Sequence, residues 1–78
     1  MKYYLQVTFN DKTTRKWTTS IKETFMSLKP DILRSNVTIK VTAGGKRAEK
    51  FLFLPQARNA FRNNLSAEIL ERQLITLL

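Results

Sequence analysis

The two glycines of the chain are adjacent, at Gly44 and Gly45, and they separate two segments that have the residue pattern of β-strands. Both central positions of a type I′ turn need positive φ, which glycine adopts without steric strain. Residues 36–42 alternate between apolar and polar side chains, and residues 46–54 end in a run that is apolar on both faces. This pattern predicts a β-hairpin whose second strand lies centrally in the sheet.

A second hairpin is predicted at the N-terminus. Residues 2–9 alternate strictly, which is typical of a half-buried strand. Residues 10–12 have the composition of a turn, and residues 13–19 are rich in the β-branched and aromatic side chains that favour a returning strand. The apolar face of the first strand consists of Tyr3, Leu5, Val7 and Phe9.

The segment after this hairpin begins with a helix-capping pattern. Ser20 and Glu23 have the spacing of a capping box, in which the serine side chain accepts a hydrogen bond from the glutamate amide and the carboxylate accepts one from the serine amide. Pro30 disfavours helical geometry in the residue before it. The helix is therefore predicted to end near Lys29, with one further turn over residues 31–35.

The C-terminal third of the sequence is predicted to be helical, with one break. Pro55 suits the first position of a helix that runs to about Asn63. Ser66 has the features of the N-cap of another helix, which extends to the end of the sequence. A single helix over residues 56–78 and a short strand over residues 73–78 are the alternatives.

These elements give the order ββαββα. They predict a single α+β domain over residues 1–78, in which a four-stranded antiparallel sheet carries helices on one face. The first and fourth strands are the most apolar, so we expect them in the middle and the strand order to be 2-1-4-3. The expected core consists of Leu5, Val7, Phe9, Phe25, Leu28, Ile39, Phe51, Phe53 and Phe61.

The side chains that most often carry catalysis are missing. The sequence contains no histidine and no cysteine, which removes the commonest general base, the thiol nucleophile and the best transition-metal ligands. The acidic residues are scattered, and the residues around Gly44 and Gly45 lack the spacing of a phosphate-binding loop. We therefore expect a protein that is not an enzyme and that uses no cofactor and no metal.

The sequence favours a cytoplasmic protein. The longest unbroken apolar run covers residues 51–54, far short of the roughly 20 residues that a membrane-spanning helix needs. Secreted domains of this size generally carry disulfides, which a chain without cysteine cannot form. We expect an intracellular location and no membrane span.

Positive charge is the most unusual global feature of the sequence. The formal net charge is +8, and residues 40–62 hold six basic residues against one acidic residue. Such a charge draws a protein to polyanions, although a solvated surface is the simpler interpretation. The residues predicted to contact nucleic acid are Lys16, Lys40, Lys46, Arg47, Lys50, Arg58 and Arg62, together with Tyr4.

Two functional hypotheses follow from this charge. In the first, the chain is an accessory protein that binds DNA or RNA, with the basic hairpin in a groove and the following helix in support. In the second, it is a small interaction or inhibitor protein, of the kind that phages and mobile elements encode, and it binds an acidic protein surface or a nucleic-acid-binding protein. No single feature of the sequence separates the two hypotheses.

The outward face of the predicted sheet offers a further site. A polar face with Tyr4 and lysines could hold single-stranded nucleic acid by stacking and phosphate contacts, although antiparallel sheets commonly have one wet face. Trp17 is predicted to lie with Thr13 and Arg15, in the core or at its edge. The outward set is expected to be Tyr4, Gln6, Thr8, Lys16, Thr38 and Lys40.

The final helix has more apolar residues than one buried face can hold. The arc expected to face the core consists of Leu70, Leu74, Leu77 and Leu78. Ile69 and Ile75 lie outside this arc and would remain in water. Surplus apolar surface on a small domain commonly marks a contact, so we predict a homodimer through this helix.

Overall fold

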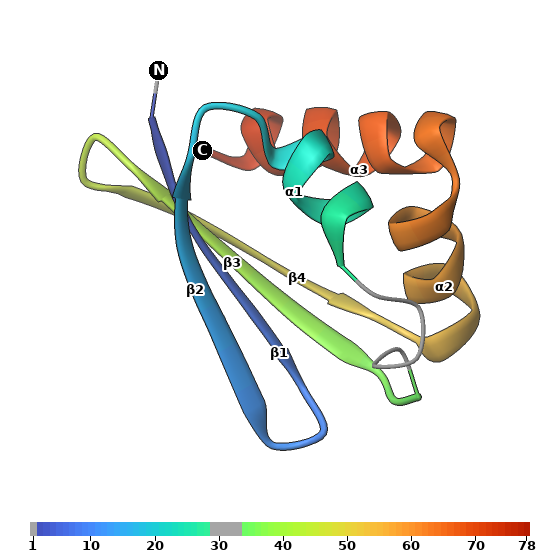
Figure 1. Cartoon of the computed structure of the whole chain (residues 1–78). Helices are drawn as coiled ribbons and strands as arrows, with labels where there is room; N and C mark the ends of the chain where they lie inside the picture. Colours follow the sequence, from blue (N-terminus) through green and yellow to red (C-terminus); the bar gives the residue numbers. More distant parts are fainter. Residues whose placement is uncertain (1, 29–33) are drawn as a thin grey trace.

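A computed structural model of the chain describes residues 2–28 and 34–78. These residues form an α+β fold with a four-stranded antiparallel sheet and three helices (Figure 1). None of the helices in this part of the chain is long and apolar enough to span a membrane. The elements are β1 Tyr3–Phe9, β2 Lys12–Thr18, α1 Ile21–Ser27, β3 Val37–Ala43, β4 Lys46–Leu52, α2 Leu54–Arg62 and α3 Asn64–Leu77.

The strands lie in the order β2-β1-β3-β4, so the predicted order 2-1-4-3 is wrong. It is β3 that pairs with β1, and β4 forms an edge of the sheet. On the face toward the helices β3 presents only buried apolar side chains, whereas β4 presents Lys46 and Lys50 in addition to Ala48 and Leu52. An edge strand tolerates these lysines because one of its sides reaches water.

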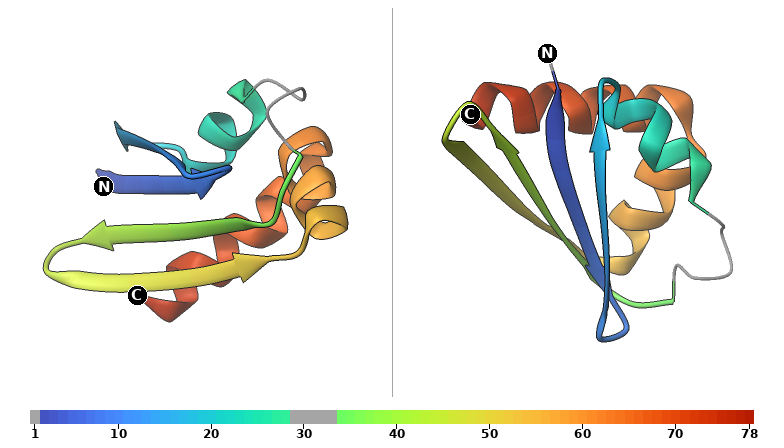
Figure 2. Two further views of the ribbon diagram at one scale, coloured as in Figure 1. Left: turned by 90° about the horizontal axis from the view of Figure 1, so that it is seen from below. Right: turned by 60° about the vertical axis from the view of Figure 1, so that its left-hand side comes forward.

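The three helices lie on one face of the sheet, and the core fills the space between the two layers (Figure 2). At its centre Phe25 of α1 and Phe61 of α2 pack edge to face, with ring centroids 5.1 Å apart. The larger buried side chains of this core are Leu5, Val7, Phe9, Ile21, Phe25, Val37, Ile39, Val41, Leu52, Phe61, Leu70 and Leu74.

Both hairpins close through two-residue turns with positive φ. Gly44 and Gly45 have φ values of 57° and 79°, as the predicted turn requires. Asn10 and Asp11 have φ values of 48° and 60°, a region that asparagine and aspartate tolerate better than most residues. The first turn is therefore shorter than predicted, and β2 already begins at Lys12.

The predicted cap of α1 is present. Ser20 Oγ accepts a hydrogen bond from the Glu23 amide at 3.2 Å. The Ser20 amide donates to Thr18 Oγ1 at 3.0 Å, and this hydroxyl takes the role predicted for the Glu23 carboxylate. α1 ends at Ser27, and Leu28 is already extended, so the helix ends slightly before the predicted position near Lys29. Most of the further turn predicted over residues 31–35 lies outside the described residues.

Two separate helices, α2 and α3, follow the sheet, which rules out one continuous helix and a C-terminal strand. The predicted N-cap at Ser66 is wrong, because Asn63 caps α3. Asn63 Oδ1 accepts hydrogen bonds from the Leu65 amide at 2.9 Å and from the Ser66 amide at 3.3 Å. The Asn63 amide donates to the Asn59 carbonyl at 2.8 Å, so a single residue closes α2 and opens α3.

Three aromatic side chains that were expected in or beside the core are exposed. The exposed fractions are 59% for Trp17, 52% for Phe51 and 60% for Phe53. Phe51 lies opposite Thr38 on the face away from the helices, and Phe53 follows the end of β4 as the N-cap of α2. The two phenylalanines pack edge to face on each other, with ring centroids 5.3 Å apart.

Candidate nucleic-acid interface

We call the face of the sheet that points away from the helices the open face. Residues paired across antiparallel strands project from the same face, so the strand register arranges the open face in three rows. The first row is Trp17, Tyr4, Thr42 and Arg47, the second is Arg15, Gln6, Lys40 and Glu49, and the third is Thr13, Thr8, Thr38 and Phe51. We call the first two the basic rows and the third the threonine row.

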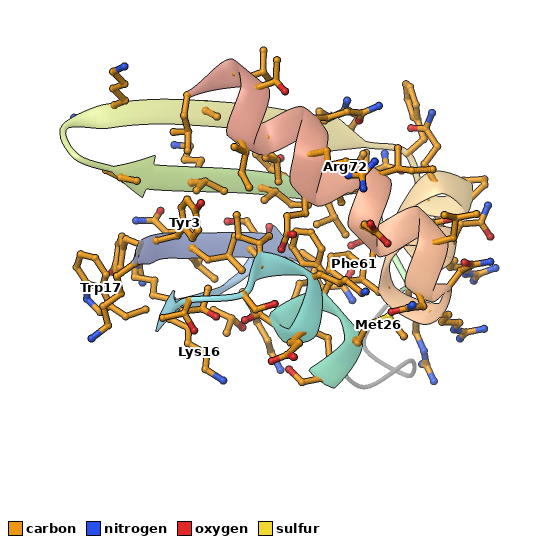
Figure 3. The ribbon with its side chains drawn as sticks, turned by 90° about the horizontal axis from the view of Figure 1, so that it is seen from above. Tyr3, Lys16, Trp17, Met26, Phe61 and Arg72 are labelled. Carbon is orange, nitrogen blue, oxygen red and sulfur yellow. The ribbon has the colours of Figure 1, made fainter. Side chains whose placement is uncertain are left out.

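The first basic row carries an aromatic pair. The rings of Tyr4 and Trp17 have centroids 5.0 Å apart and planes tilted by 48°. Figure 3 shows Trp17 at the end of the sheet, well away from Phe61 in the core. The prediction that Trp17 shares a face with Thr13 and Arg15 is correct, but this face is the open one. Because β2 has no apolar face, its alternation shows which residues share a face but not which face the helices cover.

Three exposed cations share the basic rows with the aromatic pair, namely Arg15, Lys40 and Arg47. Glu49 is the acidic side chain among the three rows, and it lies opposite Lys40 in the register. The ion pairs that Lys22 and Arg72 form with Glu68 of α3 lie away from the open face, and within residues 2–28 and 34–78 no ion pair involves the three cations of the basic rows. The basic rows therefore present positive charge that the described part of the chain does not neutralise by pairing.

A hollow lies in the middle of the basic rows. Its walls combine the Tyr4 ring with two cations and with uncharged groups that can form hydrogen bonds. The residues that line it are Tyr4, Gln6, Lys40, Thr42, Arg47, Ala48 and Glu49. This combination of an aromatic ring, cations and hydrogen-bonding groups suits a ligand that has both flat rings and negative charge.

The structure divides the predicted contact residues between the two faces of the sheet. The open face carries Tyr4, Lys40 and Arg47. The face toward the helices carries Lys16, Lys46 and Lys50, so the prediction of an outward Lys16 is wrong. Neighbours on a strand point to opposite sides, which separates Lys46 from Arg47. Lys50 Nζ donates a hydrogen bond to Gln73 Oε1 of α3.

The two arginines of α2 lie apart from the hairpin turn. Arg58 and Arg62 follow β4, whereas Gly44 and Gly45 precede it, and Figure 1 shows the turn and α2 at opposite ends of this strand. A strand of this length spans about 20 Å. The hairpin turn and the following helix therefore do not form one compact basic site.

Sequence reasoning missed Arg15 and Trp17 as site residues. A usable signal was present in the first hairpin. With a two-residue turn at Asn10 and Asp11, counting back along both strands places Trp17 opposite Tyr4, as the structure has it. This count alone indicates an aromatic pair on the face that also carries lysine and arginine.

The two residues of the predicted dimer contact lie on different flanks of α3. Ile69 and Ile75 are 48% and 41% exposed, as predicted. They are six positions apart in an α-helix, however, so they project about 120° apart around α3. Ile69 shares a flank with Gln73, which contacts β4. Ile75 shares a flank with Glu71, whose carboxylate accepts a hydrogen bond from the backbone of α1 at 2.6 Å. Leu77, predicted to face the core, is 57% exposed.

No protein-family model matches the chain, and no curated protein and no solved structure is significantly similar to it. Within residues 2–28 and 34–78, no three acidic side chains gather closely enough to hold a metal ion. The fold and the open face define a small basic α+β domain with an uncovered sheet face. Its function is therefore inferred from the chemistry of that face.

Proposed function

We propose that the chain is a non-enzymatic protein that binds nucleic acid in the cytoplasm, and that the basic rows of the open face form the contact. The observation that carries this proposal is the grouping of Arg15, Lys40 and Arg47 in the same rows as the half-buried ring of Tyr4 and the exposed ring of Trp17. Cations beside flat apolar rings match a polymer of phosphates and bases better than they match a purely acidic protein surface.

The net charge of the whole chain supports this contact from a distance. At +8 the domain attracts polyanions, and cations on the hairpin and on α2 extend the positive field beyond the open face. Lysine and arginine that neutralise phosphates release condensed counterions, so affinity falls as salt rises. In this proposal Lys46, Arg58 and Arg62 strengthen the positive field around the domain and lie outside the contact itself.

The test is fluorescence anisotropy with labelled DNA and RNA between about 50 and 300 mM salt. Replacing Lys40 and Arg47 together with alanine should make the negative slope of log K against log salt shallower by about two on duplex DNA. The matched control replaces Lys12 and Arg62, two exposed cations outside the basic rows. This control removes the same net charge and should change the slope less.

The absence of binding would overturn the proposal. Even non-specific binders reach dissociation constants of about 100 μM or better at physiological salt. If no nucleic acid binds the wild-type chain this tightly at low salt, the positive charge serves another partner. The hypothesis of an interaction or inhibitor protein with an acidic partner would then take its place.

A further inference from the structure

We propose that the open face binds single-stranded nucleic acid in preference to duplex, with unpaired bases stacked on Tyr4 and Trp17. This inference rests on the proposed function and narrows it to one class of ligand. It assigns a role to Trp17, the single tryptophan of the chain, which is 59% exposed although tryptophan is mostly buried in folded proteins.

The aromatic pair has ring surface available for bases. The planes of Tyr4 and Trp17 are tilted by 48°, so the two rings do not lie flat on each other, and 59% of the Trp17 surface remains exposed. Trp17 belongs to an edge strand that is exposed along nearly its whole length. Every base has a flat face, so stacking on such rings works for any sequence provided that the bases are unpaired.

The cations lie where the backbone of a stacked strand would pass. Arg47 ends the first row, about 14 Å across the sheet from Trp17. In the second row Arg15 lies about 7 Å from Trp17 along β2, and Lys40 lies about 12 Å from it, two strands across. Bases on the aromatic end of the rows therefore have phosphate partners on two sides. Between them, Gln6 and Thr42 offer hydrogen bonds to base edges.

A duplex cannot use the same arrangement. Its bases are stacked on one another, and only their edges are accessible in the grooves. The rings of Tyr4 and Trp17 would then meet sugar and phosphate and contribute no stacking. The three cations of the basic rows would have to bind the duplex without help from stacking, and the neighbouring Glu49 carboxylate would oppose them. Stacking thus separates unpaired strands from paired ones.

The threonine row supplies an internal control. It carries Phe51, which is 52% exposed, but its other members are threonines without charge. If any exposed aromatic side chain sufficed, Phe51 would bind bases as well as Trp17 does. The inference predicts that it does not, because the open-face side chain beside Phe51 on β4 is Glu49, whose negative charge repels phosphate.

The experiment titrates the wild-type chain with oligothymidine, oligouridine and a short DNA duplex at one salt concentration. Because Trp17 is the only tryptophan, its fluorescence reports on the site without a label. We expect quenching that saturates with either single strand, at the dissociation constant that anisotropy gives, and little quenching with duplex. The two single strands show whether the site distinguishes DNA from RNA.

Two variants complete the test. Trp17→Leu removes the ring, retains apolar volume and should weaken single-strand binding by about 5- to 150-fold, the range for the loss of one stacked base. Its duplex binding should be unchanged, and Trp17→Phe should restore part of the affinity. Phe51→Leu, the matched control, should bind as the wild type does. Circular dichroism confirms that each variant is folded.

The outcomes separate this inference from the proposed function. Salt-dependent binding without quenching, or equal loss of single-strand and duplex affinity in Trp17→Leu, would overturn the stacking site and leave nucleic-acid binding in place. A loss in Phe51→Leu as large as that in Trp17→Leu would overturn the assignment to the basic rows. If no nucleic acid binds at all, both proposals fall.

Discussion

Two aromatic pairs lie at the surface of the molecule, and their surroundings differ. Tyr4 and Trp17 pack with ring centroids 5.0 Å apart, and Phe51 and Phe53 pack with centroids 5.3 Å apart. The first pair is bordered by the cations of the basic rows, whereas the row of Phe51 contains only threonines besides it. Exposed rings alone mark a contact surface, and the charge around them indicates the kind of partner.

Removing a buried ring should destabilise the protein far more than removing a ring of the Phe51–Phe53 pair. Phe61→Ala should lower the free energy of unfolding by about 3–5 kcal/mol, because this ring is buried against Phe25. Phe53→Ala should lower it by less than about 1 kcal/mol, since Phe53 is 60% exposed. Chemical denaturation measures both. Equal losses would show that the Phe51–Phe53 pair is part of the core.

A second exposed apolar surface, on one flank of α3, predicts a protein contact. We propose that the chain forms a homodimer through the flank of α3 that carries Ile69 and Leu77, which are 48% and 57% exposed. Ile69→Glu should then raise the dissociation constant at least about tenfold, because the charge would have to be buried in the interface.

The control for the dimer is Ile75→Glu, on the flank toward α1, which should have little effect. Sedimentation at tens of micromolar protein distinguishes these cases. A monomeric wild-type chain would reject the dimer, and dissociation by Ile75→Glu alone would move the interface to the other flank.

A smaller effect separates stability from binding. Ser20→Ala should lower the free energy of unfolding by about 1 kcal/mol, because the Glu23 amide loses its acceptor at 3.2 Å. Ser20→Thr should retain most of the cap. Neither change touches the basic rows, so nucleic-acid affinity should be unaltered. Thermal denaturation and anisotropy on the same samples test this, and an affinity loss in Ser20→Ala would link α1 to the site.

Much of the fold could be predicted because each hairpin carries local information. Gly44 and Gly45 have the positive φ values that a tight turn needs, and the alternation along β1 and β3 identifies the buried face. The cap at Ser20 depends on residues close to it in sequence. Features of this kind are determined by neighbours along the chain, so the sequence alone reveals them.

The strand order and the site depended on neighbours distant in the sequence. Phe51 and Phe53 made β4 resemble a central strand, and no local pattern showed that Lys46 and Lys50 place it at an edge. The charge count over residues 40–62 treated cations as one group, although β4 turns alternate residues to opposite faces. The site therefore became clear only when the register joined the two hairpins.

Backbone amide shifts, followed by NMR as oligothymidine is added to the wild-type chain, test most directly whether the basic rows form the binding site. We expect the largest shift changes in the basic rows, at Tyr4, Arg15, Trp17, Lys40 and Arg47, and also at the indole N–H of Trp17. The threonine row and α2 should change little. Shift changes centred on α2, or on Phe51 and Phe53, would contradict the assignment of the binding site to the basic rows.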